Sequence, residues 1–131
     1  MTHARIATGR RAEEIAAREL VRHGLRVLER NVRVRYAEWG IAGELDVVAL
    51  DGSTLVFVEV KAGRSGTRSG PERPALAVGR QKQARLRRLA RARLASAPLL
   101  PRHRAIRFDV VGVVVLPGGH LGDVEWIQNA F

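Results

Sequence analysis

The residues of this chain best suited to chemistry are four charged side chains, Glu44 and Asp46 followed by Glu59 and Lys61. Side chains on a β-strand alternate between its two faces, so Glu44 shares a face with Asp46, and Glu59 shares one with Lys61. Three carboxylates beside one ammonium group would repel each other and would lose hydration on burial. A bound cation would compensate both of these costs. The pattern therefore predicts a site for a divalent metal ion.

The relative position of these charges depends on one turn. Asp51-Gly52 between two β-branched runs is a strong signal for a β-hairpin. A two-residue loop there would set Glu44 opposite Glu59, whereas a four-residue loop would set Asp46 opposite Glu59. Either loop places all four charged side chains on one face, and a three-residue loop without a bulge would separate them.

The ligand types favour a hard cation. Carboxylate oxygens without cysteine or clustered histidine are typical of Mg²⁺ or Mn²⁺ sites rather than Zn²⁺ sites. The chain has no cysteine, and its four histidines lack the spacing of a ligand pair. We therefore expect Mg²⁺ or Mn²⁺ as the cofactor.

The chain has 23 basic residues but only two lysines, and the positions of both lysines indicate the same site. At Lys61 a compact ammonium group would act as a point charge on a phosphate oxygen, whereas a planar guanidinium would be bulkier and bidentate. Lys82 lies four residues from both Val78 and Leu86, on the inward stripe of a basic amphipathic helix. We expect its side chain to point toward the carboxylates.

The elements that must position these residues follow from periodicity and turn signals. Together they predict one α/β domain, residues 1–131, with a central mixed sheet flanked by helices. We expect disorder over residues 1–8 and a mobile loop over residues 62–74, which are rich in Gly, Ser, Arg and Pro. The expected elements are a helix at 9–23, strands at 25–36 with an interruption near Asn31, 44–50 and 55–60, a helix at 75–96, a strand at 106–116 and a short final strand.

Charge and composition indicate the class of partner. The formal net charge is +10, and between Val60 and Phe108 fourteen basic residues accompany a single acid, Glu72. This distribution favours a polyanion, and a solvated helix face in an arginine-rich chain is the alternative. The residues expected to contact nucleic acid are Arg64, Arg68, Arg80, Arg85, Arg87, Arg88 and Arg91.

The absence of cysteine excludes disulfides, thiolate metal sites and a cysteine nucleophile, and it suits a reducing compartment. The longest apolar run, Val110 to Leu116, is too short to cross a bilayer. We therefore expect a cytoplasmic protein without membrane insertion.

The charged residues and their flanking motifs, taken in their order along the chain, resemble a known family. Gly43-Glu44-Leu45-Asp46 followed by Phe57-Val58-Glu59-Val60-Lys61 is similar to the Asp…Glu-x-Lys core of the PD-(D/E)XK nuclease superfamily. The resemblance is closer to the YraN family of endonuclease-like proteins, which is similar to archaeal Holliday junction resolvases. An isolated triplet of this kind arises by chance, but matching residues extend over nearly the whole chain: Gly9, Glu13, Asn31, Gly70-Pro71, Lys82, 107–111 and 127–131.

The resemblance implies a restriction-endonuclease-like core and metal-dependent hydrolysis of phosphodiester bonds in DNA, including branched or structured DNA. It also implies pairing of two copies, by analogy with resolvases. One departure is Ala62-Gly63, where a Thr-Arg pair is common in the family. The implied roles are metal binding by Asp46, Glu59 and the Val60 carbonyl, catalysis by these two carboxylates with Lys61 and Glu13, and auxiliary roles for Glu44 and Lys82.

Two alternatives to an endonuclease stay open. The first is a nucleic-acid-binding module that has the fold and the basic surface but cleaves nothing, and the second is structured RNA as the ligand. Trp39 and Trp126 are candidates for stacking on bases, with packing inside the fold as the alternative. Asp109 is expected to pair with Arg107 or another arginine rather than to bind a metal.

Overall fold

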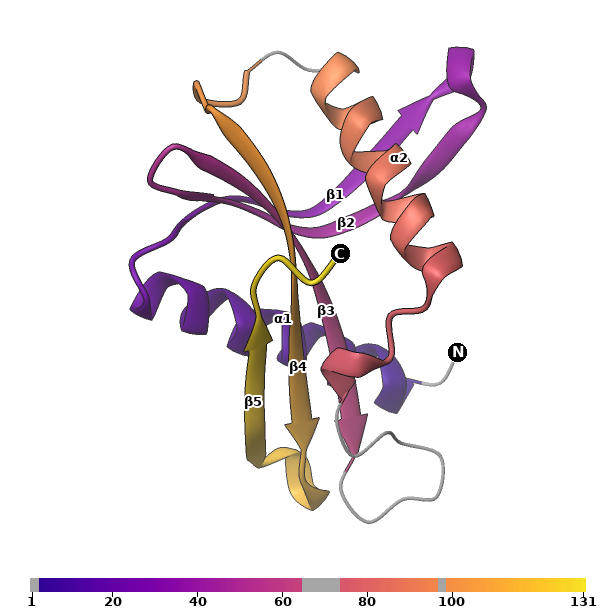
Figure 1. The fold of residues 1–131 in the computed structure, drawn as a ribbon. Helices are drawn as coiled ribbons and strands as arrows, with labels where there is room; N and C mark the ends of the chain where they lie inside the picture. Colours follow the sequence, from indigo (N-terminus) through magenta and orange to yellow (C-terminus); the bar gives the residue numbers. More distant parts are fainter. Residues whose placement is uncertain (1–2, 65–73, 97–98) are drawn as a thin grey trace.

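Five strands form one mixed sheet, with a helix packed against each face (Figure 1). The computed structural model describes residues 3–64, 74–96 and 99–131. Short 3-10 turns lie at Ala37–Trp39, Pro74–Leu76 and Pro117–Gly119. The main elements are α1 (His3–Arg22), β1 (Arg26–Tyr36), β2 (Ile41–Asp51), β3 (Thr54–Arg64), α2 (Arg80–Ser96), β4 (Ala105–Val115) and β5 (Leu121–Ile127).

The strands follow the order β1-β2-β3-β4-β5 across the sheet. Neighbours are antiparallel except β3 and β4, which run parallel and are joined by the crossover that contains α2. A parallel pair needs such a long connection, because the chain must return to the starting end of the first strand before the second strand begins. A tight turn joins only antiparallel strands. The expected single α/β domain with a mixed sheet is thus confirmed. Within the part of the chain described, no helix combines the length and the apolar character needed to cross a bilayer.

Each face of the sheet buries its own apolar core. On one face, Ala12, Ala16 and Leu20 of α1 pack against valines of the sheet. On the other face, Leu86 and Leu89 of α2 pack against residues of several strands, including β2 and β3. Full burial of one such leucine contributes about 1.5–3 kcal/mol, so both helices are held by their apolar stripes rather than by intrinsic propensity.

The hairpin turn between β2 and β3 fixes the register of the charged residues. Leu50 pairs with Leu55 and Asp51 with Thr54, so the loop consists of Gly52 and Ser53. Gly52 has φ 59°, which a type II′ turn requires at its first central position. This loop differs from both loops considered from the sequence, Asp51-Gly52 and residues 51–54. Its register agrees with that of the four-residue alternative.

Element ends differ from expectation where tertiary pairing extends a strand. Residues 62–64 belong to β3, not to the expected loop, because they continue the parallel ladder with residues 113–115 of β4. Pro74, at the other end of that loop, begins a 3-10 turn. The mobile loop expected between them lies outside the described residues. α1 begins at His3, inside the stretch for which we expect disorder.

Gly112 lets the turn at Pro74–Leu76 approach β4 closely. A Cβ atom on Gly112 would lie 2.5 Å from the Ala75 backbone nitrogen, too close for any side chain. Because backbone would have to move, Gly112→Ala should lower the free energy of unfolding by about 1–3 kcal/mol in urea denaturation. Gly79→Ala is the matched control, because open space surrounds Gly79. Equal losses in both variants would contradict the close approach.

Candidate active site

The site lies where β2 and β3 separate. Their pairing ends at Val47 and Val58, although both strands continue beyond these residues. The Val60 backbone N–H donates instead to Asp46 Oδ2 at 2.8 Å. β3 meanwhile remains paired with β4 through this stretch. We call the point where the backbone pairing of β2 and β3 ends the fork. The Asp46 side chain therefore joins the two strands at the fork, and this hydrogen bond fixes the position of its carboxylate.

Simple alternation of side chains fails in β2 at the same point. Leu45 packs in the core beneath α2, and Val47 packs in the core beneath α1, although alternation predicts one face for both. Asn31, between the pairs that join β1 to these two residues, has φ 52°. Asparagine tolerates this left-handed conformation, which interrupts an extended strand, as expected near Asn31. The local twist turns β2 so that Asp46 has neighbours from both faces.

Three carboxylates meet at this twist. Glu13 of α1 joins Glu44 and Asp46 of β2, and one oxygen of each lies within 4.8 Å of the others. Asn31 also hydrogen-bonds to the Glu13 side chain. The structure thus brings Glu13, expected to be catalytic, and Glu44, expected to be auxiliary, to Asp46, in a spacing that one divalent cation would bridge.

Glu59 lies beside this trio and has a different partner. Its side chain is only 6% exposed, and its Oε1 lies 3.0 Å from Lys82 Nζ and 4.0 Å from Lys61 Nζ. The structure therefore brings Lys82 from α2 to the carboxylates, in the direction that its helical position predicts. The nearer of the two ammonium groups belongs to Lys82 and not to Lys61.

Burial and mutual repulsion disfavour the ionised forms of Asp46 and Glu13 in this cluster. The pKa of Asp46 is raised to about 7, first by burial, then by the negative charge of Glu59 and a hydrogen bond to that carboxyl group. The Val60 N–H opposes this rise because it stabilises the carboxylate. Burial and the charge of Glu44 raise the pKa of Glu13 as well. A site that disfavours its own ionised form is suited to a bound cation.

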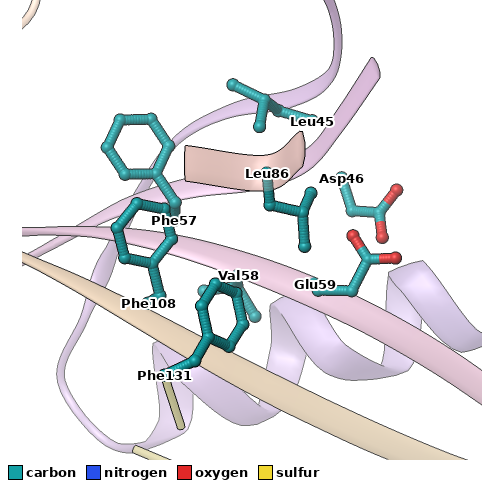
Figure 2. A pocket seen from close by; sticks show the side chains of 8 residues that line it. All are labelled: Leu45, Asp46, Phe57, Val58, Glu59, Leu86, Phe108 and Phe131. Atoms are coloured by element: carbon teal, nitrogen blue, oxygen red, sulfur yellow. The ribbon is translucent and has the colours of Figure 1, made fainter. Parts of the chain in front are cut away.

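An apolar wall causes this burial. Figure 2 shows the Asp46 and Glu59 carboxyl groups side by side at the edge of a small pocket lined by aromatic and aliphatic side chains. Phe108 stacks between Phe57 and Phe131, with ring centroids 5.6 and 5.1 Å apart. Sequence reasoning missed Phe131 as part of the site, because nothing in the short final segment signals that it folds back over Phe108.

Comparison with known proteins places the chain in a family. The model of the uncharacterised protein family UPF0102 matches residues 12–113. The chain is 48% identical over 128 residues to a UPF0102 protein of Frankia alni, covering 98% of this chain and 97% of that protein. This chain belongs to the UPF0102 family. A UPF0102 protein of Streptomyces griseus is 47% identical over 118 residues, 86% of this chain and 87% of that protein.

The UPF0102 match includes every carboxylate and lysine of the cluster but ends before β5 and Phe131. The names of these relatives carry the family designation and no activity. The resemblance to PD-(D/E)XK nucleases and the roles that it implies therefore stay predictions.

The arginines of α2 in this UPF0102 protein lie on the same helix as Lys82, which contacts the cluster. Arg80, Arg85, Arg87, Arg88 and Arg91 are all exposed. Arg85 donates to the Ala42 carbonyl of β2, and the Arg87 guanidinium lies 5.6 Å from the Phe131 ring centroid. The Arg64 side chain and Arg68 lie outside the described part of the structure.

The UPF0102 chain uses Asp109 in its core, as expected. Asp109 is fully buried and accepts two hydrogen bonds from Arg107, at 2.8 and 3.0 Å. It also accepts from the Trp126 indole N–H and from the Asn129 backbone N–H, both at 2.9 Å. The expected pairing with Arg107 is confirmed, and Trp126 takes the packing role rather than an exposed stacking role.

Proposed function

We propose that this UPF0102 protein is a metal-dependent endonuclease that hydrolyses phosphodiester bonds of DNA, with branched or structured DNA as the preferred substrate. One observation carries the proposal: mutually repelling carboxylates, of which Glu59 is buried, Asp46 half-buried and Glu44 exposed, converge at the fork of β2 and β3 beside a strongly basic helix. Structural ion clusters seldom retain a carboxyl group whose pKa is raised to about 7, because that arrangement costs stability.

The donor set fits Mg²⁺ or Mn²⁺. Glu13, Glu44 and Asp46 offer hard oxygen ligands within 4.8 Å of one another, and Asp46 also belongs to the ligand set that the nuclease resemblance implies, with Glu59 and the Val60 carbonyl. A bound ion would neutralise charge on the phosphate and lower the pKa of an attacking water. Asp46 is common to both sets, so it is the residue on which metal binding depends most.

The two lysines have different parts in this proposal. Lys82 Nζ is held 3.0 Å from Glu59, so it neutralises and positions that carboxylate. Lys61 Nζ lies 4.0 Å from the same oxygen and so is held less closely by Glu59 than Lys82 Nζ is, which leaves it freer to reach a phosphate, although the Lys82 side chain is the more exposed of the two. We therefore assign the ammonium group that contacts the substrate to Lys61 and a positioning role to Lys82.

A non-catalytic nucleic-acid-binding module is the second candidate. The ion pair between Lys82 and Glu59 favours it, because a cation already occupies one of the implied ligands. Structured RNA is the alternative ligand for the same basic surface. A cytoplasmic location and pairing of two copies complete the proposal, and sedimentation of the purified protein with and without DNA tests the pairing.

The test is cleavage of branched, nicked and single-stranded DNA by the purified protein with Mg²⁺ or Mn²⁺. We expect the parent protein to cut, and Lys61→Ala to lower the cleavage rate by about 100-fold or more, because transition-state charge loses its partner. Arg18→Gln on α1 is the matched control, since Arg18 is exposed and pairs only locally with Glu14. Its cleavage rate should equal that of the parent.

The same assay separates the two candidates. Binding by the parent that weakens with salt but produces no cleavage with either ion would favour the binding module. For duplex DNA, each phosphate neutralised should contribute about 0.9 to the slope of log affinity against log salt. Cleavage of structured RNA but not of DNA would transfer the activity to the other substrate.

A further inference from the structure

Trp39 forms one side of a groove at the far end of the β1–β2 hairpin. Its side chain is 49% exposed, a large area for an indole that the fold could have buried. The indole packs against the Tyr36 ring, with ring centroids 4.6 Å apart and the planes at 64°. The groove encloses about 340 Å³ and is lined by Trp39, Ile41, Arg88 and Arg91.

The lining of this groove matches one kind of ligand. A rigid exposed indole offers a flat π-surface, and two exposed guanidinium groups offer charge and planar hydrogen-bond donors. No described carboxylate lines the groove, although exposed Glu38 directly precedes Trp39. Its volume also falls in the range of sites that take a small organic group. Base and phosphate together present the complementary features: an aromatic face and a nearby negative charge.

A row of basic residues on α2 connects this groove with the carboxylate cluster. Lys82, Arg85, Arg88 and Arg91 follow each other at intervals of three residues. Each step turns by about 60° around the helix axis, so the row climbs from the side facing the sheet to the exposed side. Lys82 contacts Glu59, Arg85 contacts Ala42, and the last two arginines line the groove.

The length of this row sets a distance along a strand of DNA. Nine residues of helix rise by about 13.5 Å, and the half turn puts the two ends of the row on opposite sides of a helix about 11 Å wide, so the ends lie about 17 Å apart. A stacked strand advances by about 3.4 Å per nucleotide, so the row spans about five nucleotides. A strand following α2 would thus have one phosphate at the cluster and a base near Trp39 about five nucleotides away.

We propose that Trp39, Arg88 and Arg91 form a subsite that stacks an unpaired base of the nucleic acid, about five nucleotides from the cleaved bond. The inference rests on the proposed function and narrows its substrate to DNA that offers an unpaired or extruded base. Bases inside an intact duplex are already stacked on each other, so Trp39 contributes only where a base is free.

The test is equilibrium binding by fluorescence anisotropy in EDTA, with a labelled twelve-nucleotide single strand and a blunt duplex of the same sequence. EDTA separates binding from cleavage. We expect Trp39→Ala to weaken single-strand binding about tenfold and duplex binding less than twofold. Trp39→Phe should recover most of the single-strand affinity, because it restores an aromatic face. Circular dichroism confirms folding of each variant.

Arginine variants supply the matched controls. Arg88→Gln should weaken binding to both probes and lower the salt slope by about 0.7 for the single strand, because one phosphate contact is lost. Arg18→Gln on α1 should change neither affinity, since α1 and α2 pack against opposite faces of the sheet.

Two results would overturn the inference. One is equal single-strand affinity for Trp39→Ala and the parent, and the other is an equal loss for single strand and duplex. Either result with cleavage of DNA by the parent would remove the stacking subsite and leave the proposed function intact. A parent that binds neither probe in EDTA would also remove the stacking subsite, and the proposed function is then decided separately by the cleavage assay on branched DNA with Mg²⁺ or Mn²⁺.

Discussion

Asp46→Asn is expected to lower the rate of metal-dependent cleavage strongly and, at pH 8, to make the metal-free protein more stable than its parent. Asparagine keeps an oxygen that accepts from the Val60 N–H, so the fork between β2 and β3 stays closed. It removes the negative charge that faces Glu59 and Glu13. Cleavage should fall about 100-fold or more, because the residue shared by both candidate ligand sets is gone.

The direction of the pH dependence follows from the raised pKa. The pKa of Asp46 rises from its ordinary value of 3.8 to about 7 on folding, so between these values the folded state binds the proton more tightly. The parent therefore loses stability as pH rises through this window, and the loss is complete above pH 7. At pH 8 the variant should gain on the order of 1–3 kcal/mol, and this gain should vanish near pH 4.

Urea denaturation in EDTA at pH 4, 6 and 8 measures this effect. Glu14→Gln is the control, because Glu14 lies on α1 outside the cluster and pairs with exposed Arg18. A variant no more stable than the parent at pH 8 would mean that the carboxylate does not repel its neighbours. The metal hypothesis would then lose its physical basis.

Asp109→Ala is expected to cause the largest loss of stability, about 3–5 kcal/mol. The substitution leaves the Arg107 guanidinium without its buried partner, and the Trp126 and Asn129 N–H groups without their acceptor. Breaking a buried pair from one side is costly because the remaining charge stays desolvated. Urea denaturation at pH 7 measures the loss.

Asp51→Ala tests the same arginine from its exposed side. Asp51 lies 3.0 Å from Arg107, but its side chain is 40% exposed, so its removal should cost only about 0–1 kcal/mol. Similar losses for the two variants would show that burial does not govern this network. Asp109→Asn should lie between them, because it keeps an acceptor and loses the charge.

Local signals predicted most of this fold. The helical stripes of α1 and α2 and the Asp-Gly hairpin signal each reflect physics within a few residues, and the structure places elements at all of them. The exact turn did not follow, because Asp51-Gly52 and Gly52-Ser53 satisfy similar local preferences. Pairing of Leu50 with Leu55 decides between them through contacts across the sheet.

The site was predictable in its residue types but not in its grouping. Alternation along β2 places Glu44 and Asp46 together, yet it does not predict that Leu45 and Val47 enter different cores. That change depends on the left-handed conformation of Asn31 in the neighbouring strand. The proximity of Glu13 to Asp46 depends on how α1 docks, which only the completed apolar core determines.

The closing of the strand fork by a carboxylate has a mechanical consequence. Hydrogen bonds between backbone groups do not depend on the ionisation of a side chain. The Val60 N–H donates instead to the Asp46 carboxyl group, whose pKa is raised to about 7. Beyond the last backbone pair of β2 and β3, the part of the β1–β2 hairpin that bears Trp39 is thus tied to β3 by the Asp46 carboxyl group and to α2 by the hydrogen bond from Arg85 to the Ala42 carbonyl. Removal of the Asp46 oxygens would break one of these two ties and leave the other in place.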